Sequence, residues 1–153
     1  MYVTAESKAA SLPLASTLNC EVVSGSVEQP EAVNTVNCYL TRFNQGDYGA
    51  VADLFAAEGA LVPPFETPVV GRDAIASYLQ QEADGMVVNS PTIISLKGDG
   101  VGGYWVRVRG RVTALVFEVS LAWQFSLSPQ YEIEQVKIEL LASLEELIGL
   151  NSK

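Results

Sequence analysis

The chain has no histidine among its 153 residues and only two cysteines, Cys20 and Cys38. Histidine is the commonest general base near neutral pH and the commonest ligand of transition metals in proteins. Its absence excludes nucleophilic catalysis of the Ser–His and Cys–His types. Two isolated cysteines do not supply the four ligands of a structural zinc site, so we expect no metal centre.

Basic residues are scarce as well. Nine Lys and Arg stand against eighteen Asp and Glu, which gives a formal net charge of −9 and a pI of about 4.4. Nucleic acids and anionic membrane surfaces are bound by clustered cations, so neither is an expected partner. One basic cluster, Arg107, Arg109 and Arg111, has the two-residue spacing of a strand face. We interpret it as a solvated sheet face paired with nearby glutamates.

Long apolar runs are also missing. No run approaches the roughly 20 residues that a transmembrane helix needs, so we expect no membrane insertion. The first twenty residues lack the basic segment and the apolar stretch of a secretory signal peptide. A cytoplasmic protein is therefore expected, in which Cys20 and Cys38 are free thiols. A redox role for either cysteine stays open.

What the chain does contain is enough apolar residues for one folded domain with a sizeable core. Hydrophobic residues make up 48% of the sequence and charged residues 18%, below the roughly 25% of an average domain. Such a composition favours a lined cavity or a buried interface. Residues 1–29 show no sustained periodicity and are predicted to be an N-terminal extension, and residues 30–153 are predicted to form an α+β ligand-binding domain.

Three helices are predicted in the first part of this domain, where apolar residues recur at spacings of three and four. The first begins at Pro30, the second is capped by Asp47 and ends at Glu58-Gly59, and the third spans about 72–84. Their expected inward-facing residues are Val33, Val36, Leu40, Phe43, Val51, Leu54, Phe55, Ile75, Ala76 and Leu79.

Strands are predicted from Met86 onward, where the apolar periodicity changes to two. Four strands are expected, at 92–96, 104–113, 116–127 and 132–141, and the earlier ALVPPF segment is a short strand edge. Alternation along 116–127 places Trp123 on the buried face. A capping box from Ser143 to Glu146 predicts a short C-terminal helix.

Helices followed by strands predict an α+β fold. We expect a cone-shaped, curved antiparallel sheet packed on three N-terminal helices. Such a cone leaves a cavity at its open end, and ligands favour such mouths.

Several motifs in this pattern resemble a known family. They are Y-L-x-x-F-N-x-G-D-Y, then L-F-A-x-x-G-A-L-x-P-P-F-x-x-P-V-V-G, and later L-A-W-Q-F and L-L-A-S-L-E-E-L. Together they resemble the nuclear transport factor 2-like superfamily. Within it, they are most similar to the C-terminal domain of the cyanobacterial orange carotenoid protein and to its stand-alone homologues. The resemblance covers roughly residues 33–150.

This resemblance implies a non-enzymatic carotenoid-binding protein, a carrier with a role in photoprotection. In the family, a tyrosine on the first helix and a tryptophan on a late strand hold the keto oxygen of a carotenoid, and Tyr39 and Trp123 match these positions. The implied ligand is a ketocarotenoid, with its end ring in an apolar pocket. Both side chains should point into one cavity, whose expected walls are Phe43, Leu61, Phe65, Val70, Leu121 and Ile138.

The resemblance also implies partners. Stand-alone members are carriers that often form homodimers sharing one pigment, so a homodimer is expected, with a helical carotenoid-binding protein as a second partner. The family usually carries another tryptophan in a P-W-F-G segment. This chain has Ala114-Leu115-Val116-Phe117 there, and Phe117 is the expected substitute.

Two other functions remain open at this point. Isomerases and cyclases of the same fold act on small apolar substrates, and an isomerase needs a carboxylate base in the pocket. Where those enzymes place it, this chain has Pro63, and Glu66 lies beyond Phe65. The third function is a non-catalytic protein-binding module, which would present an exposed apolar sheet face.

Overall fold

The computed structural model describes residues 30–141. The predicted N-terminal extension and the C-terminal capping-box helix lie outside the described residues. Within the described range, no helix combines the length and the apolar character needed to cross a membrane.

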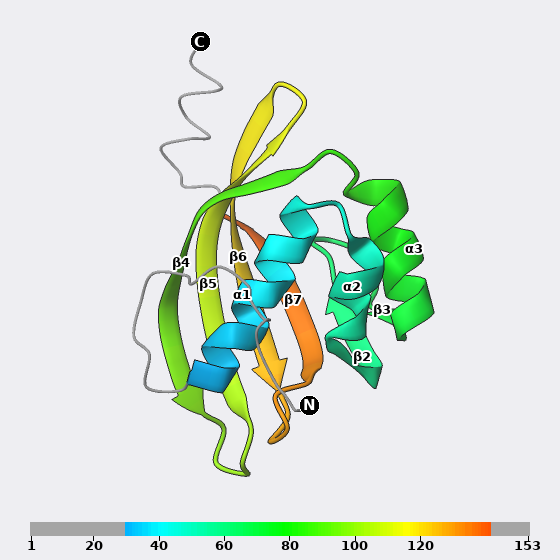
Figure 1. The fold of residues 1–153 in the computed structure, drawn as a ribbon. Helices are drawn as coiled ribbons and strands as arrows, with labels where there is room; N and C mark the ends of the chain where they lie inside the picture. Colours follow the sequence, from blue (N-terminus) through cyan, green and yellow to red (C-terminus); the bar gives the residue numbers. More distant parts are fainter. Residues whose placement is uncertain (1–29, 142–153) are drawn as a thin grey trace, which may run out of the picture.

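The described chain is one curved sheet with helices packed against it (Figure 1). The sheet has six strands in the order β3-β2-β7-β6-β5-β4, and it curves around α1. This is the α+β architecture expected from the sequence. The elements in chain order are α1 (Pro30–Asn44), α2 (Tyr48–Asp53), β2 (Phe55–Val62), β3 (Val69–Val70), α3 (Arg72–Glu82), β4 (Val87–Gly98), β5 (Tyr104–Ala114), β6 (Phe117–Leu127) and β7 (Ile133–Leu141).

Helix α1 supplies much of the core because one of its faces is apolar along its whole length. Glu31 lies in its first turn and Arg42 in its last, where each charge suits the helix dipole. The helix ends at Asn44, and Gly46 in the following turn has a left-handed φ of 75° and an N–H that donates to the carbonyl of Phe43 at 3.0 Å. Its buried side chains include Val33, Val36, Tyr39, Leu40 and Phe43.

The second predicted helix is shorter than expected. It ends at Asp53, and Phe55, which we predicted to be helical, begins strand β2. The segment after Asp53 is rich in alanine and favours a helix locally, but pairing with β7 overrides this propensity. At Gly59 an added Cβ would lie 2.7 Å from the carbonyl oxygen of Ile133, so only glycine allows the two backbones to approach this closely.

This pairing also makes the sheet mixed rather than wholly antiparallel. Strands β2 and β7 run parallel, with Leu61 beside Val136, whereas the other neighbouring strands are antiparallel. The parallel pair joins the early and late parts of the domain. The prediction of an antiparallel sheet was therefore wrong at this one pair, because β2 was not identified as a full strand.

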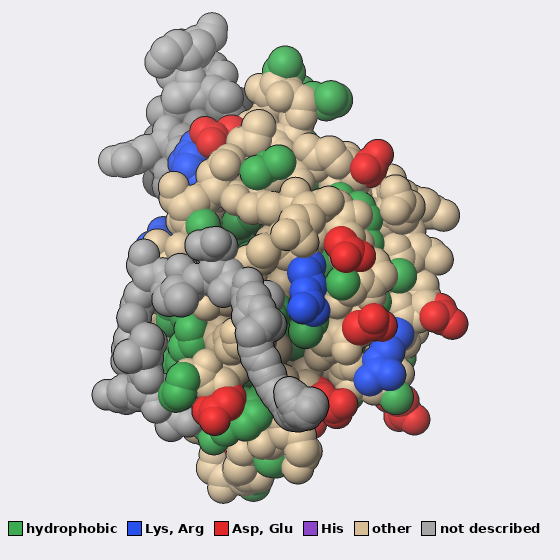
Figure 2. Space-filling model, viewed as in Figure 1, with side chains coloured by type: hydrophobic (Ala, Val, Ile, Leu, Met, Phe, Trp, Pro, Cys, Tyr) green, Lys and Arg blue, Asp and Glu red, His purple; other side chains and the backbone are tan. Residues whose placement is uncertain are grey.

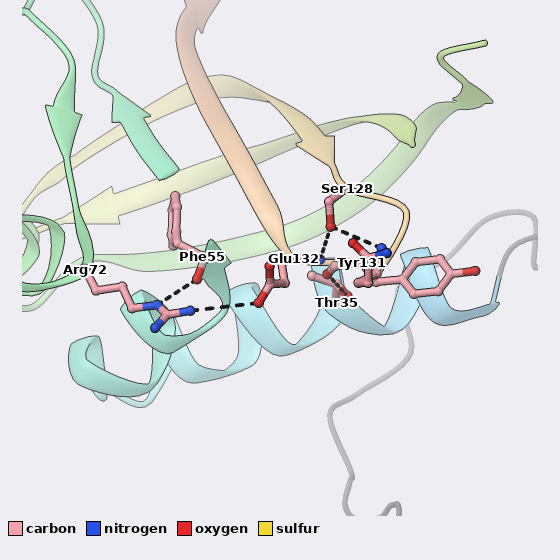
Figure 3. A network of polar contacts seen from close by, with 7 residues as sticks. Thr35, Phe55, Arg72, Ser128, Tyr131 and Glu132 are labelled. Atoms are coloured by element: carbon pink, nitrogen blue, oxygen red, sulfur yellow. Dashed lines mark hydrogen bonds and ion pairs between the residues drawn. The ribbon is translucent and has the colours of Figure 1, made fainter. Parts of the chain in front are cut away.

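A group of polar contacts holds one end of the sheet to the helices (Figure 3). The Nε of Arg72 donates to the carbonyl of Phe55 at 2.8 Å, and its guanidinium lies 3.9 Å from the carboxylate of Glu132. On α1, the hydroxyl of Thr35 donates to the carbonyl of Tyr131 at 3.0 Å. These contacts fix α1, α3, the start of β2 and the β6–β7 turn relative to one another.

Two predictions about polar side chains can be compared with the structure. Cys38 is disulfide-bonded, so the expectation of a free thiol there was wrong, and Cys20 lies outside the described residues. On the outer sheet face, Arg107 pairs with Glu139 at 2.8 Å and Arg111 with Glu118 at 3.1 Å. The interpretation of a solvated face paired with glutamates is confirmed for these two arginines.

Candidate functional site

An apolar cavity of about 290 Å³ lies between the sheet and α3. It is built by side chains from α1, β2, α3, β5, β6 and β7 and by the residues that follow β2 and α3. Almost all of these side chains are aliphatic or aromatic, which suits an apolar ligand. The lining residues are Phe43, Leu61, Pro63, Pro64, Tyr78, Leu79, Glu82, Ala83, Met86, Val112, Ala114, Phe117, Val119, Leu121, Trp123 and Ile138.

Five of the eight predicted site residues line this cavity: Phe43, Leu61, Leu121, Trp123 and Ile138. Their convergence follows from the strand register. Trp123 on β6 lies directly beside Ile138 on β7, and Leu121 lies two residues earlier on the same face. Trp123 is buried, as its place in the alternating pattern predicted. The indole therefore presents a large apolar surface to the cavity.

Tyr39 lies behind the wall rather than on it. Its ring stacks on Phe43 with a centroid separation of 6.3 Å and meets Phe125 edge-on at 5.1 Å. The side chain is fully buried. Its hydroxyl is the one buried side-chain polar atom in the described chain without a hydrogen-bond partner.

This unpartnered hydroxyl is costly. A buried polar group without a partner lowers stability by about 1–3 kcal/mol. Burial also raises the pKa of Tyr39 above its ordinary value, so the phenol stays protonated and can donate a hydrogen bond. The fold thus maintains a neutral donor in an apolar environment, one aromatic ring away from the cavity.

The structure does not place Phe65 and Val70 in the cavity wall. Phe65 is 92% exposed in the turn after Pro64, where its backbone adopts a left-handed φ of 63°. Val70 is 58% exposed because β3 is a two-residue strand at the edge of the sheet. The expectation that both are walls of this cavity was wrong in geometry, since apolar character alone does not show which way a turn or an edge strand directs a side chain. Contact of either residue with a ligand stays a prediction.

Sequence reasoning missed the α3 side of the cavity. Glu82 is the only charged side chain among the lining residues that the structure describes. It lies three positions after Leu79 and seven after Ile75, both buried, so helical spacing places it beside the same apolar face. Tyr78 also lines the cavity and donates to Glu66 at 3.2 Å. Partial burial and the negative charge of Glu66 raise the pKa of Tyr78 to about 12.

Two turns contribute residues to the wall of the cavity. The first, 63–66, follows β2, and the second, 114–117, joins β5 to β6. Pro63 and Pro64 of the first turn and Ala114 and Phe117 of the second line the cavity. We call these two segments the mouth turns.

Known proteins resemble this chain in sequence and in structure. The nuclear transport factor 2 (NTF2) domain matches residues 31–135. The orange carotenoid-binding protein of Limnospira maxima is 31% identical over 121 residues, which are 76% of this chain and 38% of that protein. That of Synechocystis sp. is 30% identical over 119 residues, 75% of this chain and 37% of that protein. The chain therefore spans well under half of the length of these relatives.

Two solved structures are similar as well. The orange carotenoid protein of Anabaena (Nostoc) sp. binding canthaxanthin has a TM-score of 0.68 and 30% identity, covering 88% of this chain and 43% of that one. A ketosteroid isomerase-like protein from Erwinia carotovora has a TM-score of 0.65 and 19% identity, covering 78% of this chain and all of that one, which is a likeness of fold alone. Because the domain match covers more than half of the sequence, the chain belongs to the nuclear transport factor 2 domain family.

Proposed function

We propose that this protein is a non-enzymatic carotenoid carrier that holds the end ring of a ketocarotenoid in the apolar cavity. The observation that carries the proposal is the buried, unpartnered hydroxyl of Tyr39 beside an apolar wall that contains Trp123. A keto oxygen accepts hydrogen bonds, and the phenol and indole each donate one. A ketocarotenoid would supply the missing acceptor and an apolar body at the same time.

The cavity residues fit this ligand with one rearrangement. Tyr39 does not itself line the cavity, but it stacks on Phe43, which does. A rotation of the Phe43 ring would open the cavity towards the Tyr39 hydroxyl. The ring could then meet Tyr39 edge-on instead of stacking on it, and aromatic pairs favour both arrangements. The similar orange carotenoid proteins support the same ligand class.

The volume of the cavity indicates whether a bound carotenoid would need a partner protein to cover it. A carotenoid is too long for a space of about 290 Å³, so part of the polyene would protrude through the mouth. Water contact along a polyene is unfavourable. Our proposal therefore includes a cover over the mouth, either a second copy in a two-fold homodimer or a helical carotenoid-binding protein. A cytoplasmic role in photoprotection is also part of the proposal.

The first experiment is expression in a host that makes canthaxanthin. The purified wild-type protein should be coloured, with an absorption spectrum shifted from that of the free pigment. Tyr39→Phe and Trp123→Phe should each lower the pigment content and move the absorption maximum, because each removes or displaces one donor. Tyr48→Phe is the matched control, since its hydroxyl is also buried but donates to the carbonyl of Ala83 at 2.9 Å. A colourless wild-type protein would reject the proposal.

Glu82 favours a second candidate, an isomerase- or cyclase-like enzyme. Such chemistry requires a carboxylate base at the cavity, and the sequence had not indicated one. Glu82 lines the cavity, although the residue is exposed to solvent. The test is turnover of a β,γ-unsaturated ketone by the pigment-free protein. Activity that is lost in Glu82→Gln and kept in Glu58→Gln, a change in β2 outside the cavity, would favour the enzyme. No turnover by the wild-type protein would exclude this isomerase reaction.

A further inference from the structure

The two mouth turns hold large apolar side chains in solvent. Phe65 is 92% exposed, Leu115 94% and Val116 90%. Exposed apolar residues are common singly, but here three lie next to the lining residues of one cavity. Phe117, beside Val116, is both exposed and part of the cavity wall. The exposed apolar residues of the second mouth turn are therefore continuous with the cavity wall at Phe117.

The backbone of these turns is unfavourable for the residues that occupy it. Phe65 and Leu115 have φ values of 63° and 57°, in the left-handed region that glycine and asparagine prefer. Ala114 pairs with Phe117, so the β5–β6 connection is a two-residue hairpin turn. Of its two central residues only Leu115 has a positive φ, and a two-residue turn of this kind favours glycine at that first position. Neither conformational preference nor core packing accounts for these residues, which suggests a role in contact with another apolar surface.

The shape and charge of this region limit the kinds of partner that could bind it. The β5–β6 hairpin projects beyond the body of the domain, and hydrophobic side chains cover its end (Figures 1 and 2). A stable protein interface buries roughly 800 Å² of surface on each partner, and a narrow projection offers much less than this area. Glu82 in the wall and Glu66 in the first mouth turn are acidic, and no lining residue in the described chain is Lys or Arg. These acidic groups oppose docking on an anionic surface.

We propose that the mouth turns dock on the surface of an electrically neutral, zwitterionic lipid bilayer. Phe65, Leu115 and Val116 enter the interface between headgroups and acyl chains, and the cavity faces the membrane. The proposal of membrane docking is based only on the exposed apolar residues of the mouth turns. Its purpose, direct exchange of an apolar ligand between bilayer and cavity, rests on the proposed carotenoid function. Because the contact uses a hairpin tip, it needs neither a spanning helix nor a basic segment.

The test is flotation of the full chain with phosphatidylcholine vesicles. In the first variant, Leu115→Gly and Val116→Asn together place glycine at the one positive-φ position of this turn, so the fold should be kept or stabilised. Phe65→Asn is the second variant, since asparagine tolerates the left-handed backbone. The control is Val101→Asn, which removes an apolar side chain that is 82% exposed near the other end of β5, roughly 35 Å away.

Wild type and Val101→Asn should float, and the double variant should partition at least about tenfold less, because two apolar side chains leave the interface. Added phosphatidylglycerol should weaken flotation at low salt, since the protein and this lipid are both negative. Equal flotation of wild type and double variant would overturn the proposal. So would a wild-type protein that stays in solution, including one whose dimer the double variant dissociates.

Pigment loading in the canthaxanthin host separates this proposal from the carotenoid function. A coloured protein that does not float with vesicles would contradict the membrane docking but not the carotenoid function. A colourless protein that floats through its mouth turns would support the docking and contradict the carotenoid function.

Discussion

Replacing Tyr39 by Phe removes a single oxygen atom from a fully buried position. In the ligand-free protein this hydroxyl has left water without gaining a partner in the described chain. Such a group costs about 1–3 kcal/mol, so the variant should be more stable than the wild type, by about 1–2 kcal/mol. In a domain of this size the gain corresponds to a rise in Tm of about 2–8 °C.

The effect should change sign when a ketocarotenoid is bound. The Tyr39 hydroxyl then donates to the ligand, and its removal costs the complex about 1 kcal/mol. Because the same removal stabilises the empty protein by about 1–2 kcal/mol, the affinity should fall by about 2–3 kcal/mol, or roughly 30- to 150-fold. Thermal unfolding of the pigment-free protein, followed by circular dichroism, measures the first effect. Titration with canthaxanthin in detergent measures the second. One substitution that stabilises the empty protein and weakens the complex would identify a hydroxyl kept for the ligand.

Tyr48→Phe is the matched control for the stability measurement. Its hydroxyl donates to the carbonyl of Ala83 at 2.9 Å, so its removal breaks a buried hydrogen bond. The free energy of unfolding should fall by about 1 kcal/mol. If Tyr39→Phe destabilises the pigment-free protein as much as Tyr48→Phe does, then the Tyr39 hydroxyl has a partner and our reasoning fails.

Two further predictions concern alkaline pH and the β2–β7 contact. Tyr78 has a pKa of about 12 against an ordinary value of about 10, so its stabilising contribution is complete below pH 10 and is lost as the pH rises to about 12. Tyr78→Phe should reduce this alkaline loss in denaturant titrations, and a tyrosinate absorbance change confined to pH 10 would refute the shift. Gly59→Ala should destabilise the fold by about 2 kcal/mol or more, because the new Cβ meets the carbonyl oxygen of Ile133. Gly49→Ala has open space in α2 and should stabilise by about 0.5–1 kcal/mol, so equal urea midpoints for the two variants would contradict the close contact.

Much of the fold could be predicted because the periodicity of α1, α3 and β5–β7 is strong. Strand β4 was predicted only at 92–96, although it spans Val87–Gly98. Pro91 interrupts its pattern, and the register shifts between Asn89 and Thr92, where Ser90 has a positive φ. Proline is tolerated there because β4 is an edge strand with a bulge. Local sequence cannot show that a strand will lie at an edge.

The site was predictable where side-chain direction follows from a regular element. Alternation along β6 placed Trp123 correctly, and the same kind of argument applied to α3 would have found Glu82. Phe65 lies in a turn, where no periodicity sets the direction of a side chain. The Leu115-Val116 pair was visible in the sequence only as a departure from the family's P-W-F-G segment. Nothing in its pattern showed that the pair would be exposed at the end of a hairpin.

The parallel contact of β2 with β7 has a consequence for how the chain folds. Leu61 and Val136 are neighbours in the sheet but are separated by most of the domain in sequence. Contacts of this kind require a long loop to close before they contribute any stability, which slows folding. During synthesis, β2 has no partner for this edge until β7 has left the ribosome. A chain that stops before Ile133 would therefore expose the edge of β2 and the ring of Phe55, and we expect it to aggregate rather than fold.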